Sequence, residues 1–261
     1  MSKTNKKSID EITTKLNVGK TIKENKKHYH KAKIPLIVCG SLFIIALIII
    51  NFKPFAKIQS KNYSVRGIDV SHYQGDINWK QVLEEDIDFV YIKATEGSSY
   101  VDECFEKNKE ALSSERFAFG MYHFFSFDSS PEKQAKHFIK TVGDLKGHLV
   151  PVVDVEYYGK YQKNPPKKEE VRKTVQTMLD LLEEEYNVKP MIYSTTPFYN
   201  KYLNGKFDDY PLWIRNVYFK PPYDWTIWQY TDHLKLDGIN GKEKYVDCNV
   251  FNDRLERYII K

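Results

Sequence analysis

An apolar run that ends in two acidic residues constrains the fold of this chain more than any other feature. It reads Val150-Pro-Val-Val-Asp-Val-Glu-Tyr157. Side chains of a strand alternate between its two faces, so Asp154 and Glu156 share one face. A strand that is apolar on both faces until its last residues is typical of a buried barrel strand whose carboxyl end opens at the mouth. The alternative is an exposed edge strand with two solvated charges, which would leave Val150 and Val152 on the wet face.

The spacing of the two acids indicates a type of chemistry. At a rise of roughly 3.3 Å per residue, they lie about 6–7 Å apart along the strand. Two carboxyl groups at that separation can serve one glycosidic bond, one as an acid and the other as an anion. The run therefore predicts a hydrolytic pair at the mouth of a barrel.

The N-terminal part of the chain predicts a membrane anchor. Residues 34–50 carry no charge, and continued through Phe52 they reach the roughly 17–25 residues that a spanning helix requires. The alternative is a signal peptide, but the apolar stretch exceeds the usual ~7–15 residues and no A-x-A-like site follows. Residues 1–33 hold ten lysines against three acidic residues. This excess of positive charge places the tail in the cytoplasm and the rest of the chain outside it, in a periplasm or facing a wall.

We therefore expect four segments. They are a Lys-rich cytoplasmic tail at 1–33, a transmembrane anchor at 34–52, a linker at 53–64 and one catalytic domain at 65–261. The net charge of +5 belongs to the tail, which carries +7, while the remainder has 30 basic and 32 acidic residues. A nearly neutral domain lacks the basic field that nucleic-acid binding needs, so no nucleic-acid partner is expected.

Strand-like and helix-like patterns alternate after Arg66. Helix and strand alternate five times before three strands follow with only loops between them, which predicts an α/β fold, a TIM-like β/α barrel with eight strands and about five helices. The last connections are too short for helical crossovers, so the final strands are expected to depart from parallel order. The expected strands are 67–70, 89–94, 118–125, 150–156, 190–194, 212–215, 226–230 and 245–250. The expected helices are 79–85, 103–113, 131–142, 169–186 and 198–203.

Two further acids stand at strand positions of the same kind. Asp69 lies between Ile68 and Val70, and Asp247 between Val246 and Cys248. A lone Asp between apolar neighbours is more often a structural residue than a catalytic one. Three acidic strand ends at one barrel mouth favour an active site, because the first and last strands are neighbours in a closed barrel.

Aromatic and amide side chains near these strand ends are candidate sugar-binding groups, since rings stack on sugars and amides bind hydroxyls. About half of such a set usually packs in the core instead. The histidines show no metal-ligand spacing, and no metal or cofactor is expected. Cys104 and Cys248 are either a disulfide pair or, as we expect, small buried hydrophobes. The candidate substrate-binding residues are Tyr122, Tyr193, Trp213, Trp228 and Gln229.

Several motifs together resemble glycoside hydrolase family 25, the lysozymes of the N-acetylmuramidase type. They occur in the family's order and span Arg66 to Phe251. The motifs are GIDVSHYQG at 67–75, YIKATEG at 91–97, GMYHF at 120–124, PVVDVE at 151–156, LWI at 212–214, WQY at 228–230 and VDCNVF at 246–251.

The resemblance implies a β/α barrel and cleavage of the β-1,4 bond between N-acetylmuramic acid and N-acetylglucosamine in peptidoglycan. By position, it implies that Glu156 is the general acid and Asp154 the partner that stabilises charge. Asp69 and Asp247 resemble the family's two additional active-site acids. We expect a monomer that acts on peptidoglycan strands and is held to the lipid bilayer through residues 34–52. The alternatives are a wall-binding module without turnover, and a glycosidase for chitin or another amino-sugar polymer.

Overall fold

The computed structural model describes residues 55–115 and 117–261, which belong to one compact unit, Lys53–Lys261. The expected tail at 1–33 and membrane anchor at 34–52 lie outside the described residues. Among the described residues, no helix combines the length and apolar character needed to span a bilayer.

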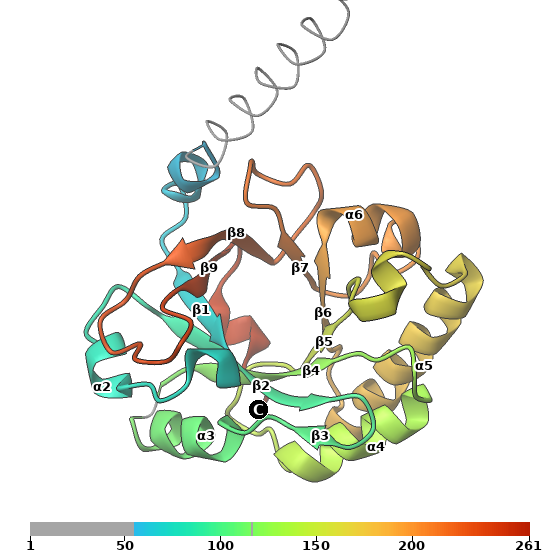
Figure 1. The fold of residues 1–261 in the computed structure, drawn as a ribbon, viewed down its shortest axis with the longest axis horizontal. Helices are drawn as coiled ribbons and strands as arrows, with labels where there is room; N and C mark the ends of the chain where they lie inside the picture. The colour runs from blue at the N-terminus through green and yellow to red at the C-terminus, as the bar shows by residue number, and fades with distance from the viewer. Residues whose placement is uncertain (1–54, 116) are drawn as a thin grey trace, which may run out of the picture. The chain divides into compact units, whose positions relative to one another are not determined.

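Eight strands form a closed barrel with helices around it, as the alternating pattern predicted (Figure 1). Around the barrel the order is β1-β9-β8-β7-β6-β5-β4-β2, and pairing of β1 with β2 closes the ring. A short additional strand, β3 (Tyr100–Val101), pairs with the end of β2 and was not predicted. The barrel strands are β1 (Arg66–Val70), β2 (Phe89–Glu96), β4 (Phe119–Phe124), β5 (Val152–Asp154), β6 (Met191–Thr195), β7 (Leu212–Arg215), β8 (Ile227–Leu234) and β9 (Val246–Phe251).

The direction of the last strand decides where its acid lies. Neighbouring strands from β1 through β2 and on to β8 are parallel, but β9 runs antiparallel to both β1 and β8. A loop without an α-helix joins β8 to β9, and such a connection suits an antiparallel pair, whereas parallel neighbours usually need a helical crossover. The expected departure from parallel order is confirmed. Because β9 is reversed, its N-terminal end lies at the mouth with the carboxyl ends of the other strands.

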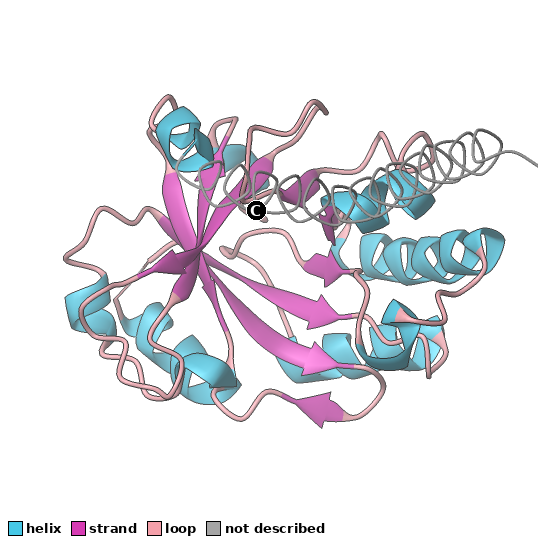
Figure 2. Ribbon diagram, turned by 45° about the horizontal axis from the view of Figure 1, so that its top comes forward, coloured by secondary structure: helices cyan, strands magenta, loops and turns pink. Residues whose placement is uncertain are grey.

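The helices pack on the outside of the barrel (Figure 2). Helix α4 has the bounds predicted for it, because Ser130 caps its first turn, Pro131 begins it and Gly143 follows its end with a φ of 72°. Its buried positions face the sheet, as an amphipathic helix requires. The helices are α2 (Trp79–Val82), α3 (Phe105–Ser114), α4 (Pro131–Val142), α5 (Lys168–Tyr186) and α6 (Thr196–Phe198), which continues into a π-helical turn (Tyr199–Leu203).

Aromatic rings fill the barrel below the mouth. The ring of Tyr91 lies 5.1 Å from that of Trp213, and the ring of Phe89 lies 5.5 Å from that of Phe251. Gly120 provides the room, since a Cβ there would lie 2.3 Å from the Tyr91 ring. The interior is therefore a packed core rather than a pore, and only the mouth is open to substrate.

No α-helix connects the strands on one flank of the barrel, because loops make the connections on both sides of β8. Residues 55–60, expected to belong to a linker, form a helix there, and its Ala56 and Ser60 side chains are buried. Beyond this helix, the ring of Tyr63 packs 5.1 Å from Trp225 and 6.5 Å from Trp228. This segment covers apolar surface that a crossover helix would otherwise cover.

Candidate active site

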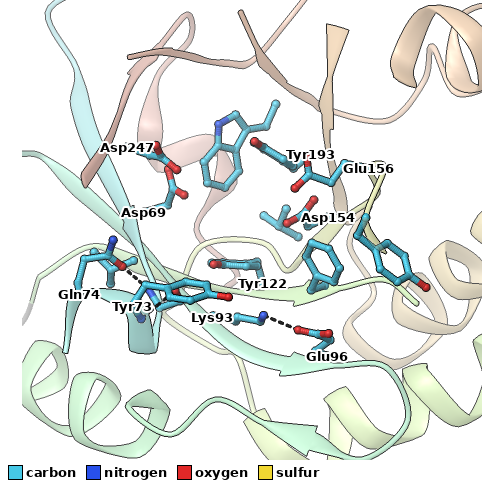
Figure 3. Close-up of a pocket in the computed structure, with 16 residues that line it drawn as sticks. Asp69, Tyr73, Gln74, Lys93, Glu96, Tyr122, Asp154, Glu156, Tyr193 and Asp247 are labelled. Atoms are coloured by element: carbon cyan, nitrogen blue, oxygen red, sulfur yellow. Dashed lines mark hydrogen bonds and ion pairs between the residues drawn. The ribbon is translucent and has the colours of Figure 1, made fainter. Parts of the chain in front are cut away.

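A cavity of about 450 Å³ opens at the mouth of the barrel, and all four predicted acids line it (Figure 3). Asp69 and Asp247 lie on one side of it, while Asp154 and Glu156 lie on the other, with Tyr122 between the two pairs. The remaining lining includes Ser71, Tyr73, Gln74, Lys93, Glu96, Phe124, Tyr158, Tyr193 and Trp213.

Strand register brings each pair of acids together. Asp69 on β1 is directly opposite Asp247 on the reversed strand β9. On the other side, β5 ends at Asp154, but the chain continues to pair with β6 because the Val155 amide donates to the Tyr193 carbonyl at 2.9 Å. The alternation of faces is thereby kept, so Val155 is fully buried while Asp154 and Glu156 both face the cavity.

Two amide side chains hold the Asp69 carboxyl. Asn249 Nδ2 donates to Asp69 Oδ2 at 2.7 Å, and Gln229 Nε2 donates to the same oxygen at 3.1 Å. Each amide is oriented in turn, because its oxygen accepts from an aromatic residue. The Trp213 indole N–H donates to Asn249 at 2.8 Å, and the Tyr193 hydroxyl donates to Gln229 at 3.0 Å. The orientation of Asp69 therefore depends on residues from β6, β7, β8 and β9.

Asp154 is the most deeply buried of the four acids, with 8% of its surface exposed. Its Oδ1 atom is buried and has no hydrogen-bond partner among the described residues. Burial raises the pKa of Asp154 well above its usual range, and the neighbouring Glu156 carboxyl raises it further. A buried polar atom without a partner is unusual in a folded protein, and at a cavity wall it can receive a donor from a bound substrate.

Burial also raises the pKa of the other three carboxyls. It raises the pKa of Glu156 to about 7, of Asp69 to about 6 and of Asp247 to about 8. The positive charge of Arg215 opposes the shift at all three. Near neutral pH the site can therefore hold both protonated and ionised carboxyls, which an acid-plus-anion mechanism needs.

Two cations accompany the acids. Lys93 is 7% exposed, its Nζ atom lies 2.7 Å from Glu96 Oε2, and it lies 5.0 Å from the centre of the Phe124 ring. Both residues belong to the YIKATEG motif at 91–97. Arg215 was missed, although it ends β7 two residues after Trp213 and therefore lies on the same face of the strand as Trp213. It pairs with Asp232 at 2.7 Å.

The five candidate substrate-binding residues differ in whether they line the cavity. Tyr122, Tyr193 and Trp213 line the cavity, whereas Trp228 and Gln229 do not. Trp228 is fully buried on the face of β8 that points away from the cavity, and its indole N–H donates to the Asn216 carbonyl at 2.8 Å. The structure thus places Trp228 in the core of the flank.

Gln229 is fully buried too, and its amide is engaged by Asp69 and Tyr193. Tyr73 and Gln74, which had been read only as part of a family motif, line the cavity after β1. Their position directly after the first expected strand was the signal that could have identified them as cavity residues from the sequence.

A barrel with paired carboxyls at the open end of its parallel strands has the architecture of a glycosidase. The profile of glycosyl hydrolases family 25 matches residues 68–239. The chain belongs to this family, and it is a glycoside hydrolase of the lysozyme class.

Individual relatives agree with this assignment. A family 25 glycosyl hydrolase from Bacillus anthracis superposes with a TM-score of 0.71 at 44% identity, over 76% of this chain and 93% of that chain. Lysozyme M1 of Streptomyces globisporus is 30% identical over 219 residues, 75% of this chain and 70% of the relative. The uncharacterized protein YegX of Escherichia coli K12 is 37% identical over 213 residues, 78% of this chain and 75% of the relative.

Proposed function

We propose that this protein is a membrane-anchored hydrolase of peptidoglycan, and that it cleaves the β-1,4 bond between N-acetylmuramic acid and N-acetylglucosamine. The observation that carries the proposal is the cavity in which Asp154 and Glu156 face Asp69 and Asp247. Similarity to Lysozyme M1 supports the choice of substrate. We propose in addition that the protein is a monomer.

Glu156 is the proposed general acid. A group that protonates a leaving oxygen at neutral pH needs a pKa near the working pH, and burial raises the pKa of Glu156 to about 7. It is less buried than Asp154 and lines the cavity, so its proton is accessible to a bound glycan. After protonation the bond between the leaving oxygen and the anomeric carbon breaks, and positive charge develops on the sugar.

Asp154 is the proposed partner that stabilises this charge. As the sugar becomes cationic, the ionised form of Asp154 is favoured, since an opposite charge close by lowers the pKa of a carboxyl. Its unpartnered Oδ1 serves either of two routes. In one it attacks the anomeric carbon directly, and in the other it accepts the N–H of the substrate's N-acetyl group while that group attacks.

Asp69 and Asp247 are proposed to bind the sugar on the opposite side of the cavity. Two amides bind Oδ2 of Asp69, and a hydrogen bond with Asp247 lowers the pKa of Asp69, so the two acids form a joined pair that can bind substrate hydroxyls. Tyr122, Tyr193 and Trp213 supply ring surface around the acids. No cofactor takes part in this scheme.

The products of digestion test the proposed bond. Purified peptidoglycan is digested with the protein, and the sugar at each new reducing end is identified by mass spectrometry. We expect N-acetylmuramic acid at that end. N-acetylglucosamine there would place the cut at the other bond of the repeat. Equal turnover of chitin would favour a general amino-sugar glycosidase, and binding without new ends would favour a wall-binding module.

The anchor is proposed from the sequence of residues 1–52. The uncharged run at 34–52 follows ten lysines in residues 1–33, so the tail would be cytoplasmic and the barrel extracytoplasmic. We expect the full-length chain in the membrane fraction, with the barrel digested by protease added from the outer face and the tail protected. A mature protein that begins near residue 56 in the soluble fraction would show that the segment is a signal peptide.

A further inference from the structure

Exposed apolar side chains gather on one flank of the barrel. Six large hydrophobic side chains are exposed among the described residues, and four of them lie either in the helix at 55–60 or in the loop after β7. We call these four the flank patch. Its members are Phe55 (46% exposed), Ile58 (59%), Tyr218 (39%) and Phe219 (49%).

The two segments of the flank patch are joined to each other. The Lys220 backbone N–H donates to Gln59 Oε1 at 2.8 Å, so the loop is bonded to the helix. The Lys220 ammonium also lies 5.6 Å from the centre of the Tyr63 ring. In Figure 1 the helix and the β7–β8 loop lie at the same edge of the barrel. The four side chains therefore form one surface.

The helix at 55–60 has two distinct faces. Ala56 and Ser60, one turn apart, are buried against the barrel, while Phe55 and Ile58 face solvent. Lys57 is exposed beside them, as are Lys61 and Lys220. Apolar side chains bordered by lysines are typical of a surface that lies in the boundary between lipid headgroups and acyl chains.

The covalent chain brings this surface close to the proposed anchor. Only two residues separate Phe52 from Phe55, and an extended chain spans at most ~3.6 Å per residue, so their Cα atoms are within about 11 Å. If residues 34–52 span the bilayer, Phe55 emerges at the headgroup level. The flank patch therefore contains the described residue that is nearest along the chain to the proposed anchor.

We propose that the flank patch is a lipid-binding surface, which inserts Phe55, Ile58, Tyr218 and Phe219 at the bilayer surface while the neighbouring lysines contact anionic headgroups. The proposal rests on the membrane anchor proposed above. In Figure 1 the barrel is seen close to its axis, and the helix at 55–60 and the β7–β8 loop lie at its rim. If the bilayer lies against that flank, the cavity at the barrel mouth opens parallel to the membrane surface. Glycan strands that lie parallel to the membrane can then enter it.

Quenching by brominated lipid tests the contact. The full chain is reconstituted in vesicles of phosphatidylcholine and phosphatidylglycerol, with or without bromine near the glycerol end of the acyl chains. The four native tryptophans are at most 5% exposed, so a fifth one reports its own surroundings. Phe219→Trp places it in the patch. Val101→Trp is the matched control, because Val101 is an exposed apolar residue on β3 at the opposite edge of the barrel.

We expect brominated lipid to remove the extra emission of F219W and to leave that of V101W unchanged. Both variants should retain hydrolysis of soluble peptidoglycan fragments, which shows that they are folded. If the chain floats with the vesicles but F219W is quenched no more than V101W, the patch proposal is overturned and the anchor stands. A dimer in which the F219W emission is not quenched would show that a second copy covers the patch, and this result overturns the patch proposal as well. A chain that does not float with vesicles overturns both the anchor and the patch, and leaves the hydrolase activity unaffected.

Discussion

Replacing Glu156 with Gln gives the sharpest test of the proposed chemistry, because it keeps the shape of the side chain and removes the proton. Burial raises the pKa of Glu156 to about 7, so about half of the molecules carry that proton at pH 7 and about a tenth at pH 8. Turnover of the parent should therefore fall about tenfold per pH unit on the alkaline side. Loss of acid catalysis in the variant should cost roughly 10²–10⁴-fold at the optimum.

The assay is the initial rate of reducing-end release from purified peptidoglycan as a function of pH. Glu96→Gln is the matched control, since Glu96 is a carboxylate that lines the same cavity but pairs with Lys93. The control should keep its alkaline limb near pH 7, whatever its effect on substrate binding. E156Q should still fold and bind glycan. Near-parent turnover in E156Q, or an alkaline limb that survives the substitution, would refute the assignment of Glu156 as the acid.

Three further variants test the rest of the site. Asp154→Asn should reduce turnover, because it removes the carboxylate proposed to stabilise the charge that develops on the sugar; near-parent turnover would contradict that role. Asn249→Leu removes a donor to Asp69 and leaves the buried Trp213 indole N–H unpaired, so denaturant unfolding should show a loss of about 1–3 kcal/mol; parent stability would contradict the network. Asp247 has a folded pKa of about 8 against 3.8, so its stabilising contribution is complete below the unfolded value and is lost as pH rises through 8. Relative to the parent, D247N should therefore gain on the order of 4 kcal/mol in unfolding free energy between about pH 4 and pH 7, and parallel pH profiles would contradict the raised pKa of Asp247.

Much of the barrel was predictable because its signals are local. Periodicity marks each strand and helix independently of the others, and Pro131 stands in the first turn of α4, where proline is favoured. Asp154 and Glu156 were assigned to one face from alternation alone, which is a property of any extended chain. Asp69, Asp154 and Glu156 could be brought to one mouth because parallel barrel strands send their carboxyl ends to the same side, whereas Asp247 reaches that mouth because β9 is reversed.

What the sequence determined by itself is therefore the order of the elements, the face of each side chain and the set of carboxyls. The tertiary structure decided what depends on neighbours distant in the chain. Reversal of β9 set Asp247 opposite Asp69, and only the closed ring brings Asn249 to the same carboxyl. Trp228 looked like a sugar platform but is covered by Tyr63 from the segment expected to be a linker. The elevated pKa values arise in the same way, because burial is a property of the packed assembly and cannot be read from any one segment.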